Sequence, residues 1–214
     1  MIEKIARNLS MTDRTIEEHD QVIDGKFYGA IRGGNVLEYG PGTEETFANH
    51  CIERGARYVV CISASYFNVE RYHRRIARQI MQKTTVISQL IKKIRGPKGE
   101  ILRIADDGAH ITLAANSFDR IVALWSLPYY GRNMTECKQL LRRMMTMLKP
   151  GGIAIICPLM VGGASPGPEF ITEEKLIPIL EASVFKTEGF DFHVDKVKIG
   201  RDDPKSRLII TKVK

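Results

Sequence analysis

The stretch from Asn35 to Glu45, Asn-Val-Leu-Glu-Tyr-Gly-Pro-Gly-Thr-Glu-Glu, constrains the fold of this chain more than any other. Its apolar run over residues 36–39 predicts a short buried strand that ends at two glycines. Thr43 then predicts the N-cap of a helix that continues through Ile52. A strand, a tight turn and a helix N-terminus in this order are the arrangement with which α/β proteins hold nucleotide-like ligands.

The two glycines of this turn, Gly40 and Gly42, have no Cβ atom. The backbone can therefore bend sharply there, and a ligand can lie directly on it. Since Gly-x-Gly also ends many ordinary strands, the glycines alone do not identify a ligand.

Three carboxylates around the turn narrow the choice of ligand. Glu38 precedes the turn, and Glu44 and Glu45 are expected in the first turn of the helix. A phosphate about 5 Å from one such carboxylate would be opposed by roughly 3 kcal/mol at an effective dielectric near 20, which disfavours NAD and ATP. S-adenosylmethionine carries an ammonium and a sulfonium but no phosphate, so it suits the site better. In the alternative interpretation Glu44 and Glu45 only complement the helix dipole, which leaves Glu38 unexplained.

Strands and helices are predicted to alternate along the chain. Strands are expected at residues 36–39, 56–63, 100–105, 118–124, 153–157, 190–199 and 207–213, and helices at 12–22, about 66–95, 134–148 and from Thr172 to Val184. A turn is expected at residues 149–152, and Thr12 or Asp13 is expected to cap the first helix. The alternation implies βαβ units and a parallel sheet, and the last two strands imply an antiparallel hairpin that closes it. The fold class is therefore α/β, with a mainly parallel seven-stranded sheet.

Length and composition indicate one domain over residues 1–214, with an N-terminal helical cap at 1–34 and an extended basic helical segment at 65–99. Tyr28 in the cap is expected either to line a ligand pocket or to pack in the core. The four cysteines form no C-x-x-C pair, so buried free thiols are expected, with no metal site or disulfide framework. No signal peptide and no run of about 18 apolar residues is found, which predicts a cytoplasmic protein without membrane contact.

The positive charge of the chain is concentrated in one segment. Residues 65–98 hold nine basic residues and one acidic residue, a net charge of +8, which leaves 7 − 8 = −1 for the rest of the chain. Arg71, Arg74, Arg75 and Arg78 are candidates for contacts with nucleic-acid phosphates, with nearby aromatic residues available for stacking. Two other interpretations stay open, a solvated face of an amphipathic helix and an interface with a protein partner.

Four short motifs, in their order along the chain, resemble motifs of the class I S-adenosylmethionine-dependent methyltransferases, especially those of the small methyltransferase-domain proteins. The residues that carry the resemblance are Val36-Leu-Glu-Tyr-Gly-Pro-Gly42, the span from Asp107-Gly-Ala-His110 through Asn116-Ser-Phe-Asp119 to Leu127, Leu148-Lys-Pro-Gly-Gly152 and Thr187-Glu-Gly-Phe190. The resemblance spans roughly residue 27 to the C-terminus. It implies a Rossmann-like three-layer sandwich with S-adenosylmethionine as cofactor.

The resemblance also implies roles at the first motif. Glu38 would accept a hydrogen bond from the ammonium of the cofactor, and Gly40 and Gly42 would let its methionine portion rest on the backbone. Farther along, Asp107 would bond the adenine amino group, and the Gly108 N–H would meet a ring nitrogen.

The main chain at Leu124 would border the methionine end of the cofactor. For Asp107 the alternative is an Asx-turn at the end of a strand. His110, Tyr129 and Tyr130 follow the relevant strands and border the acceptor in this interpretation, but none has an assigned catalytic role.

The chain departs from the family pattern in three ways. The second strand ends in Cys61-Ile-Ser-Ala-Ser65, so Ser63 or Ser65 stands where the family usually has an acid that bonds the ribose. Charge-assisted bonds of about 1.5–3 kcal/mol are lost with that acid. Glu44 replaces the third glycine of the first motif, and the chain advances 45 positions from Ile62 to Asp107, which is more than one helix needs.

Three functions are compatible with these observations. The first is methyl transfer to a small-molecule acceptor, for which the protein mainly aligns donor and nucleophile. The second is methylation of RNA through the basic segment. The third is a degenerate partner subunit that keeps the fold without the chemistry, because the second-strand acid is missing.

Overall fold

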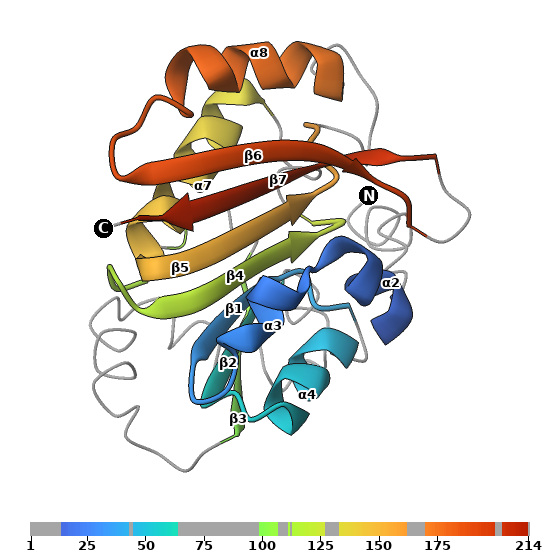
Figure 1. Cartoon of the computed structure of the whole chain (residues 1–214), viewed down its shortest axis with the longest axis vertical. Helices are drawn as coiled ribbons and strands as arrows, with labels where there is room; N and C mark the ends of the chain where they lie inside the picture. Colours follow the sequence, from blue (N-terminus) through green and yellow to red (C-terminus); the bar gives the residue numbers. More distant parts are fainter. Residues whose placement is uncertain are drawn as a thin grey trace.

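The computed structural model describes residues 14–42, 45–63, 99–106, 111, 113–126, 133–161, 170–199 and 203–213. Within them one seven-stranded sheet has the order β3-β2-β1-β4-β5-β7-β6 (Figure 1). The strands are β1 (Asn35–Tyr39), β2 (Tyr58–Ile62), β3 (Glu100–Ile104), β4 (Phe118–Leu124), β5 (Leu148–Cys157), β6 (Phe190–Val197) and β7 (Lys205–Lys212). Strands β1 to β5 pair in parallel, and β7 pairs antiparallel with β5 and β6. The predicted fold class and hairpin are confirmed.

Helices cover both faces of this sheet and make three layers. The helices α2 (Ile16–Val22), α3 (Gly25–Gly29) and α4 (Thr46–Glu53) pack on one face, where Phe27 and Phe47 meet Val36 and Val59 in one core. The helices α7 (Met134–Met147) and α8 (Glu173–Ser183) share the other core with the opposite side of the sheet. Strands β1 and β2 lie between the two cores, which explains their nearly continuous apolar sequences.

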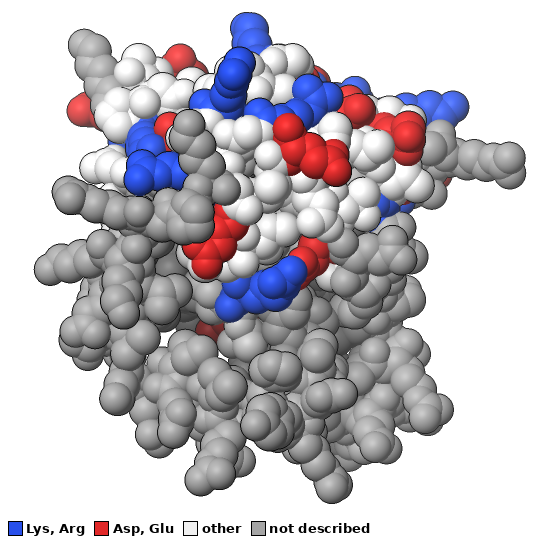
Figure 2. All heavy atoms as spheres, turned by 90° about the horizontal axis from the view of Figure 1, so that it is seen from below, with Lys and Arg blue, Asp and Glu red and all other residues white. Residues whose placement is uncertain are grey.

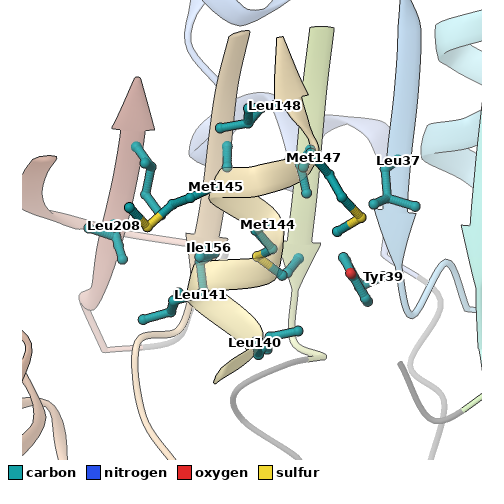
Figure 3. Close-up of a cluster of buried hydrophobic side chains, with 14 of the residues drawn as sticks. Leu37, Tyr39, Leu140, Leu141, Met144, Met145, Met147, Leu148, Ile156 and Leu208 are labelled. Carbon is teal, nitrogen blue, oxygen red and sulfur yellow. The ribbon is translucent and has the colours of Figure 1, made fainter. Parts of the chain in front are cut away.

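The helix α7 shows how the second core is built. Asn133 caps it by accepting the Glu136 N–H at 3.0 Å. Its buried side chains lie along one face and point at the sheet (Figure 3), as the spacing of apolar residues predicts. They are Cys137, Leu140, Leu141, Met144, Met145 and Met147.

Two predicted boundaries are wrong. The first described helix, α2, begins at Ile16, because Thr15 and Glu18 form a reciprocal capping box. The predicted caps, Thr12 and Asp13, lie outside the described residues. Residues 149–152, predicted as a turn, lie within β5, where the register with β4 jumps from Phe118↔Leu148 to Arg120↔Ile153. Between these two pairs β5 has three more residues than β4. The extra residues form a β-bulge, so the Lys-Pro-Gly-Gly sequence lies within the strand.

Arg120 on β4 anchors the short helix α3 to the sheet. Its guanidinium, on a residue 4% exposed, donates to the backbone oxygens of Phe27 at 2.7 Å, Lys26 at 3.0 Å and Asp119 at 2.6 Å. The carbonyls of Lys26 and Phe27 belong to the last turn of α3, where intrahelical donors run out. The arginine therefore satisfies carbonyls that a five-residue helix leaves unpaired.

Two further polar contacts attach the hairpin to helices. Arg207 on β7 pairs with Asp195 on β6 and donates to the Val22 oxygen at the end of α2. The Glu173 carboxylate at the start of α8 accepts the Ser206 N–H at 2.7 Å and the Ser206 hydroxyl at 2.8 Å. The hairpin is thus fixed to helices on both faces of the sheet.

The remaining sequence expectations divide into those that are confirmed and those that fall outside the structure. The four cysteines are free and buried, as predicted. In the described part of the chain, no helix is both long and apolar enough to cross a bilayer. The helix predicted over residues 66–95, with its arginines, lies outside the described residues.

The hydrogen bonds from Arg120 to α3 and Asp119 lead to a prediction about stability. The substitution Arg120→Met is expected to lower the free energy of unfolding by about 2–3 kcal/mol, because hydrogen bonds to a charged group are lost and buried carbonyls stay unpaired. Chemical denaturation measures the effect. The control Arg142→Met on the exposed face of α7 is expected to change stability by less than about 0.5 kcal/mol. Equal effects of the two substitutions would contradict a stabilising role for the hydrogen bonds of Arg120.

Candidate functional site

The carboxyl ends of β1, β2 and β4 meet at one edge of the sheet. The last residue of β1 lies beside the last residue of β2 and beside the residue before the end of β4. This register brings together predicted site residues from three segments: Glu38, Gly40, Gly42, Ser63 and Leu124. Asp107 and Gly108 lie outside the described residues. The structure shows the end of β3 at Ile104 and the chain after it up to Asp106.

The turn after β1 depends on its first glycine for two reasons. Gly40 has a φ of +67° and Gly42 a φ of +75°, both in the left-handed region that favours glycine. A Cβ atom on Gly40 would lie 2.6 Å from the Cβ of Ser126, the second residue after β4. The Gly40 N–H donates to the Ile62 oxygen at 2.8 Å, which fixes the turn against β2. Gly40 therefore lets the loop after β4 come close to the loop after β1.

Glu38 is a buried carboxyl group in the middle of the sheet. It is 4% exposed, and its register neighbours are Cys61 on β2 and Val122 on β4. Cys61 and Val122 belong to the core beneath α4, so Glu38 faces that helix while Leu37 and Tyr39 face α7 (Figure 3). The only hydrogen bond to its carboxyl group that the described residues show comes from the Cys61 thiol, a weak donor, at 3.8 Å.

This environment changes the ionisation of Glu38. Burial raises the pKa of Glu38 to about 8, the Cys61 thiol opposes that rise, and the charge of Glu45 adds to it. At neutral pH the carboxyl group of the ligand-free chain is therefore largely protonated. A cation beside it would favour the carboxylate.

Glu45 has a different role from the one predicted. It is the N-cap residue of α4, with a φ of +52° and no capping hydrogen bond from its side chain, instead of a residue of the first helical turn. The prediction that Thr43 caps this helix is wrong, since Glu45 holds that position. The carboxylate of Glu45 forms a two-pronged ion pair with Arg103 on β3, Oε1 to Nε at 2.6 Å and Oε2 to Nη2 at 2.5 Å. The pair ties the start of α4 to the edge strand.

Ser63 follows β2 directly. Its N–H donates to the Ile104 oxygen at 3.1 Å, and the residue is 9% exposed. Ser63, one of the two serines predicted at the position of the second-strand acid, therefore lies at the same edge of the sheet as the glycine turn.

The segment before α2 reaches the end of β4. The Arg14 guanidinium lies 4.5 Å from the centroid of the Trp125 ring, within range of a cation–π interaction. This contact places Arg14 at the carboxyl edge of the sheet, beside the end of β4. Tyr28 instead packs among helices: its hydroxyl donates to Asp20, and its ring lies 4.4 Å from the Arg54 guanidinium.

Sequence reasoning missed the pair Glu45–Arg103 and the residues Trp125 and Ser126. Glu45 and Arg103 are 58 residues apart, so no local pattern joins them. Trp125 and Ser126 lie within the motif at the end of the fourth strand, but nothing in their residue types predicts the left-handed φ of +50° at Trp125.

These groups fit a cationic ligand without phosphate. The buried Glu38 carboxyl group, whose one hydrogen-bond donor among the described residues is a thiol, lies two residues before a turn with two left-handed glycines. An ammonium or a sulfonium beside Glu38 would favour its carboxylate form and attract it, whereas a phosphate would favour the protonated form and gain no such attraction.

Comparison of the sequence with family models gives one match. A model described as a methyltransferase domain matches residues 37–156, which is 120 of the 214 residues. The match runs from β1 through β5 and includes the glycine turn, Ser63 and the end of β4. Comparison with curated protein sequences found no match.

Solved structures share the fold at low identity. The N-methyltransferase NodS from Bradyrhizobium japonicum WM9, in complex with S-adenosyl-L-homocysteine, has 18% identity and a TM-score of 0.60, over 99% of this chain and 98% of NodS. Phosphoethanolamine N-methyltransferase 1 from Haemonchus contortus has 15% identity and a TM-score of 0.56, over 99% of this chain and 48% of that protein. The [4+2]-cyclase SpnF has 16% identity and a TM-score of 0.54, over 91% of this chain and 80% of that one. Because a cyclase is among these structures, the likeness shows the fold and not the reaction.

Burial of Glu38 leads to a prediction about pH. Between about pH 5 and 8 the folded chain holds a proton that the unfolded chain has lost, so stability falls as pH rises, by at most about 1.4 kcal/mol per pH unit. Above pH 8 this contribution levels off. The substitution Glu38→Gln is expected to remove this slope in the ligand-free protein, as measured by denaturation across that range. Glu188→Gln, on the exposed turn before β6, is the control for loss of a carboxylate, and matching slopes in both variants would contradict the prediction.

The ion pair between Glu45 and Arg103 leads to a second prediction. Glu45→Gln and Arg103→Gln are each expected to lower the free energy of unfolding by about 1 kcal/mol, since the Arg103 side chain is 54% exposed. A double-mutant cycle is expected to give a coupling energy of about 0.5–1 kcal/mol. The pair Arg14–Glu18, one turn apart at 3.3 Å, serves as the comparison and is expected to couple less strongly. Additive effects at Glu45 and Arg103 would show that the pair does not hold α4.

Proposed function

Because this chain belongs to the methyltransferase domain family, the class I S-adenosylmethionine-dependent enzymes, we propose that it transfers the methyl group of this cofactor to a small-molecule acceptor. The observation that carries the assignment of the site is the buried Glu38 carboxyl group beside a glycine turn, at the edge where β1, β2 and β4 end. Family membership supports the cofactor, and the charge of the site supports its placement there.

In this proposal each site residue has a defined task. Glu38 accepts from the ammonium of the cofactor, and Gly40 and Gly42 supply a backbone surface for its methionine portion. The main chain at Leu124 borders the same portion. Because a cation favours the carboxylate, binding releases the proton that Glu38 holds in the ligand-free chain.

The adenosine portion belongs on the other side of the glycine turn. Asp107 and the Gly108 N–H bond the adenine ring, and Ser63 bonds the ribose with a hydroxyl in place of the usual carboxylate. A neutral hydroxyl contributes less than a charge-assisted bond, so Ser63 predicts weaker cofactor binding than an acid at this position would give.

When bound, the cofactor supplies a methyl group already activated on a sulfonium. The protein then needs mainly to exclude water and hold the acceptor in line. An amine acceptor needs little more than this alignment, whereas a hydroxyl acceptor needs a general base. Two proteins that share the fold are named N-methyltransferases, which is consistent with an amine.

The described part of the face in Figure 2 gives no separate support for a nucleic-acid acceptor. In the described part of the face in Figure 2, basic and acidic side chains are interspersed and neither sign forms a continuous field. The basic segment with Arg71, Arg74, Arg75 and Arg78 lies outside the described residues, so RNA methylation rests on the +8 charge of residues 65–98 alone. It predicts RNA binding that falls steeply with salt and is lost when the four arginines become alanine.

Calorimetric titration with S-adenosylmethionine and S-adenosylhomocysteine tests the proposal. The wild-type chain is expected to bind both ligands, and Asp107→Ala is expected to weaken binding about tenfold or more through loss of one charge-assisted bond. The control Asp191→Ala, on the exposed far edge strand β6, is expected to bind as wild type does. Transfer of a labelled methyl group to small molecules of a cell extract, but not to its RNA, would support the acceptor class.

Two outcomes would contradict the proposal. If the methyl group is transferred to RNA, and the variant with the four arginines changed to alanine loses that transfer, the acceptor is RNA and not a small molecule. Folded protein that binds neither ligand would contradict the cofactor site and favour the hypothesis of a partner subunit.

A further inference from the structure

The segment from Arg14 to Val22 depends on tertiary contacts, because its helix α2 has only seven residues. A helix so short is at most marginally stable in water by itself. Arg14 lies on the Trp125 ring after β4, and the Val22 oxygen at the end of the helix accepts from Arg207 on β7. Between these two contacts lies His19, whose side chain is buried and 7% exposed.

The imidazole of His19 lies flat against the first turn of α4. Its ring and the Phe47 ring are nearly parallel, with an interplanar angle of 9° and a distance of 5.3 Å between the centroids. Phe47 is fully buried and is the second residue of α4, the helix that follows the glycine turn. The segment from Arg14 to Val22 therefore bridges the end of β4 and the start of α4.

One hydrogen bond fixes the tautomer of this imidazole. His19 Nδ1 lies 2.8 Å from the Thr15 oxygen, one helical turn earlier. A carbonyl oxygen can only accept, so Nδ1 carries the proton and Nε2 is the unprotonated nitrogen of the neutral ring. Among the described residues the Thr15 oxygen is the only hydrogen-bond partner of the ring. A second proton would therefore enter at Nε2 and put a positive charge against Phe47.

The charges of its own segment do not compensate for such a proton. Burial lowers the pKa of His19, while the hydrogen bond to Thr15 and the charges of Glu18 and Asp20 oppose that change. The Arg14 guanidinium adds to the lowering. The ring is therefore neutral at pH 7, and its proton uptake is linked to leaving the buried position.

The elements packed around α2 direct their titratable groups elsewhere. On α4, the Glu45 carboxylate pairs with β3, and the Glu53 carboxylate lies 3.9 Å from the His50 ring. On α3, the Tyr28 hydroxyl donates to Asp20 at 2.5 Å. In the part of the chain that the structure describes, α4 thus meets the imidazole of α2 with the apolar ring of its first turn.

We propose that His19 is a pH-sensitive latch for the segment from Arg14 to Val22. The neutral ring holds this segment against α4 and the end of β4, and uptake of a proton at Nε2 releases it. A charged ring needs water or an acceptor at Nε2, so it leaves the stack on Phe47. Arg14 then leaves the Trp125 ring with the rest of the segment. The latch operates in the ligand-free chain and does not depend on the proposed reaction.

The fluorescence of Trp125 tests the latch, because this residue is the only tryptophan of the chain. As pH falls from 7.5 to 5, the emission maximum of the ligand-free wild-type protein is expected to move to longer wavelengths below about pH 6.5, the ordinary pKa of histidine. The ring loses Arg14 and meets water, while circular dichroism keeps the signal of the folded sheet. His19→Phe keeps the stack and cannot take up a proton, so its emission is expected to stay constant.

A second variant separates the charge from the hydrogen bond. His19→Gln also cannot ionise in this range, but it keeps an N–H donor for the Thr15 oxygen. Its emission is likewise expected to stay constant between pH 7.5 and 5. His50→Gln, on α4 outside the stack, is the control and is expected to show the wild-type shift.

The melting temperature gives an independent measurement. Between about pH 5 and 6.5 the unfolded chain binds the proton of His19 more readily than the folded chain, so this contribution to stability falls as pH falls. Glu38 acts in the opposite direction, but equally in wild type and in His19→Phe. The melting temperature of wild type relative to His19→Phe is therefore expected to fall by ~2–4 °C from pH 7.5 to 5.

The latch requires both results. A wild-type emission that does not change with pH, or an equal emission shift in wild type and both His19 variants, would overturn it. An equal pH dependence of the melting temperatures of wild type and His19→Phe would overturn it as well. Loss of the emission shift in His50→Gln would assign the titration to the other histidine and also overturn it.

Discussion

Burial of β1 on both faces is the constraint on which the rest of this structure depends. A strand between two cores has no water to satisfy polar side chains, so each polar group in it needs a partner or changes its ionisation. Four of the five residues of β1 are buried, and the one acid among them, Glu38, meets only a thiol donor among the described residues. Packing of the two cores offsets the free-energy cost of burying that carboxyl group. A cationic ligand would give the carboxyl group the partner that the described residues do not supply.

The parts of the fold that depend on local periodicity were predictable. Apolar runs, turn sequences and the spacing of strands gave the parallel sheet, its antiparallel hairpin and the apolar face of α7. Two of the boundaries that failed depend on contacts between distant residues, whereas the start of α2 is set by the local capping box of Thr15 and Glu18. Arg103 binds Glu45 and draws its carboxylate away from the helix end, and pairing with β4 holds residues 149–152 in β5 although Lys-Pro-Gly-Gly favours a turn.

The candidate site was predictable only in part for the same reason. The residues at the ends of strands, Gly40, Ser63 and Leu124, follow from the alternation of elements, because parallel strands end at one edge. The contact of Ser126 with Gly40 requires the left-handed φ of Trp125, which no residue type in that motif specifies. The roles of Asp107 and Gly108 stay predictions, since both lie outside the described residues.

The two edge strands of the sheet carry charge, and this affects how molecules of this protein meet one another. An edge strand presents unpaired backbone groups to which another chain can add, which is a common route to aggregation. On β3 the exposed residues are Glu100 and Arg103, and on β6 they include Asp191, His193 and Lys196. A strand added at either edge would have to desolvate these side chains, and at β3 it would also compete with the ion pair to Glu45. The charged side chain that ties α4 to β3 would therefore also oppose the addition of a further strand at this edge.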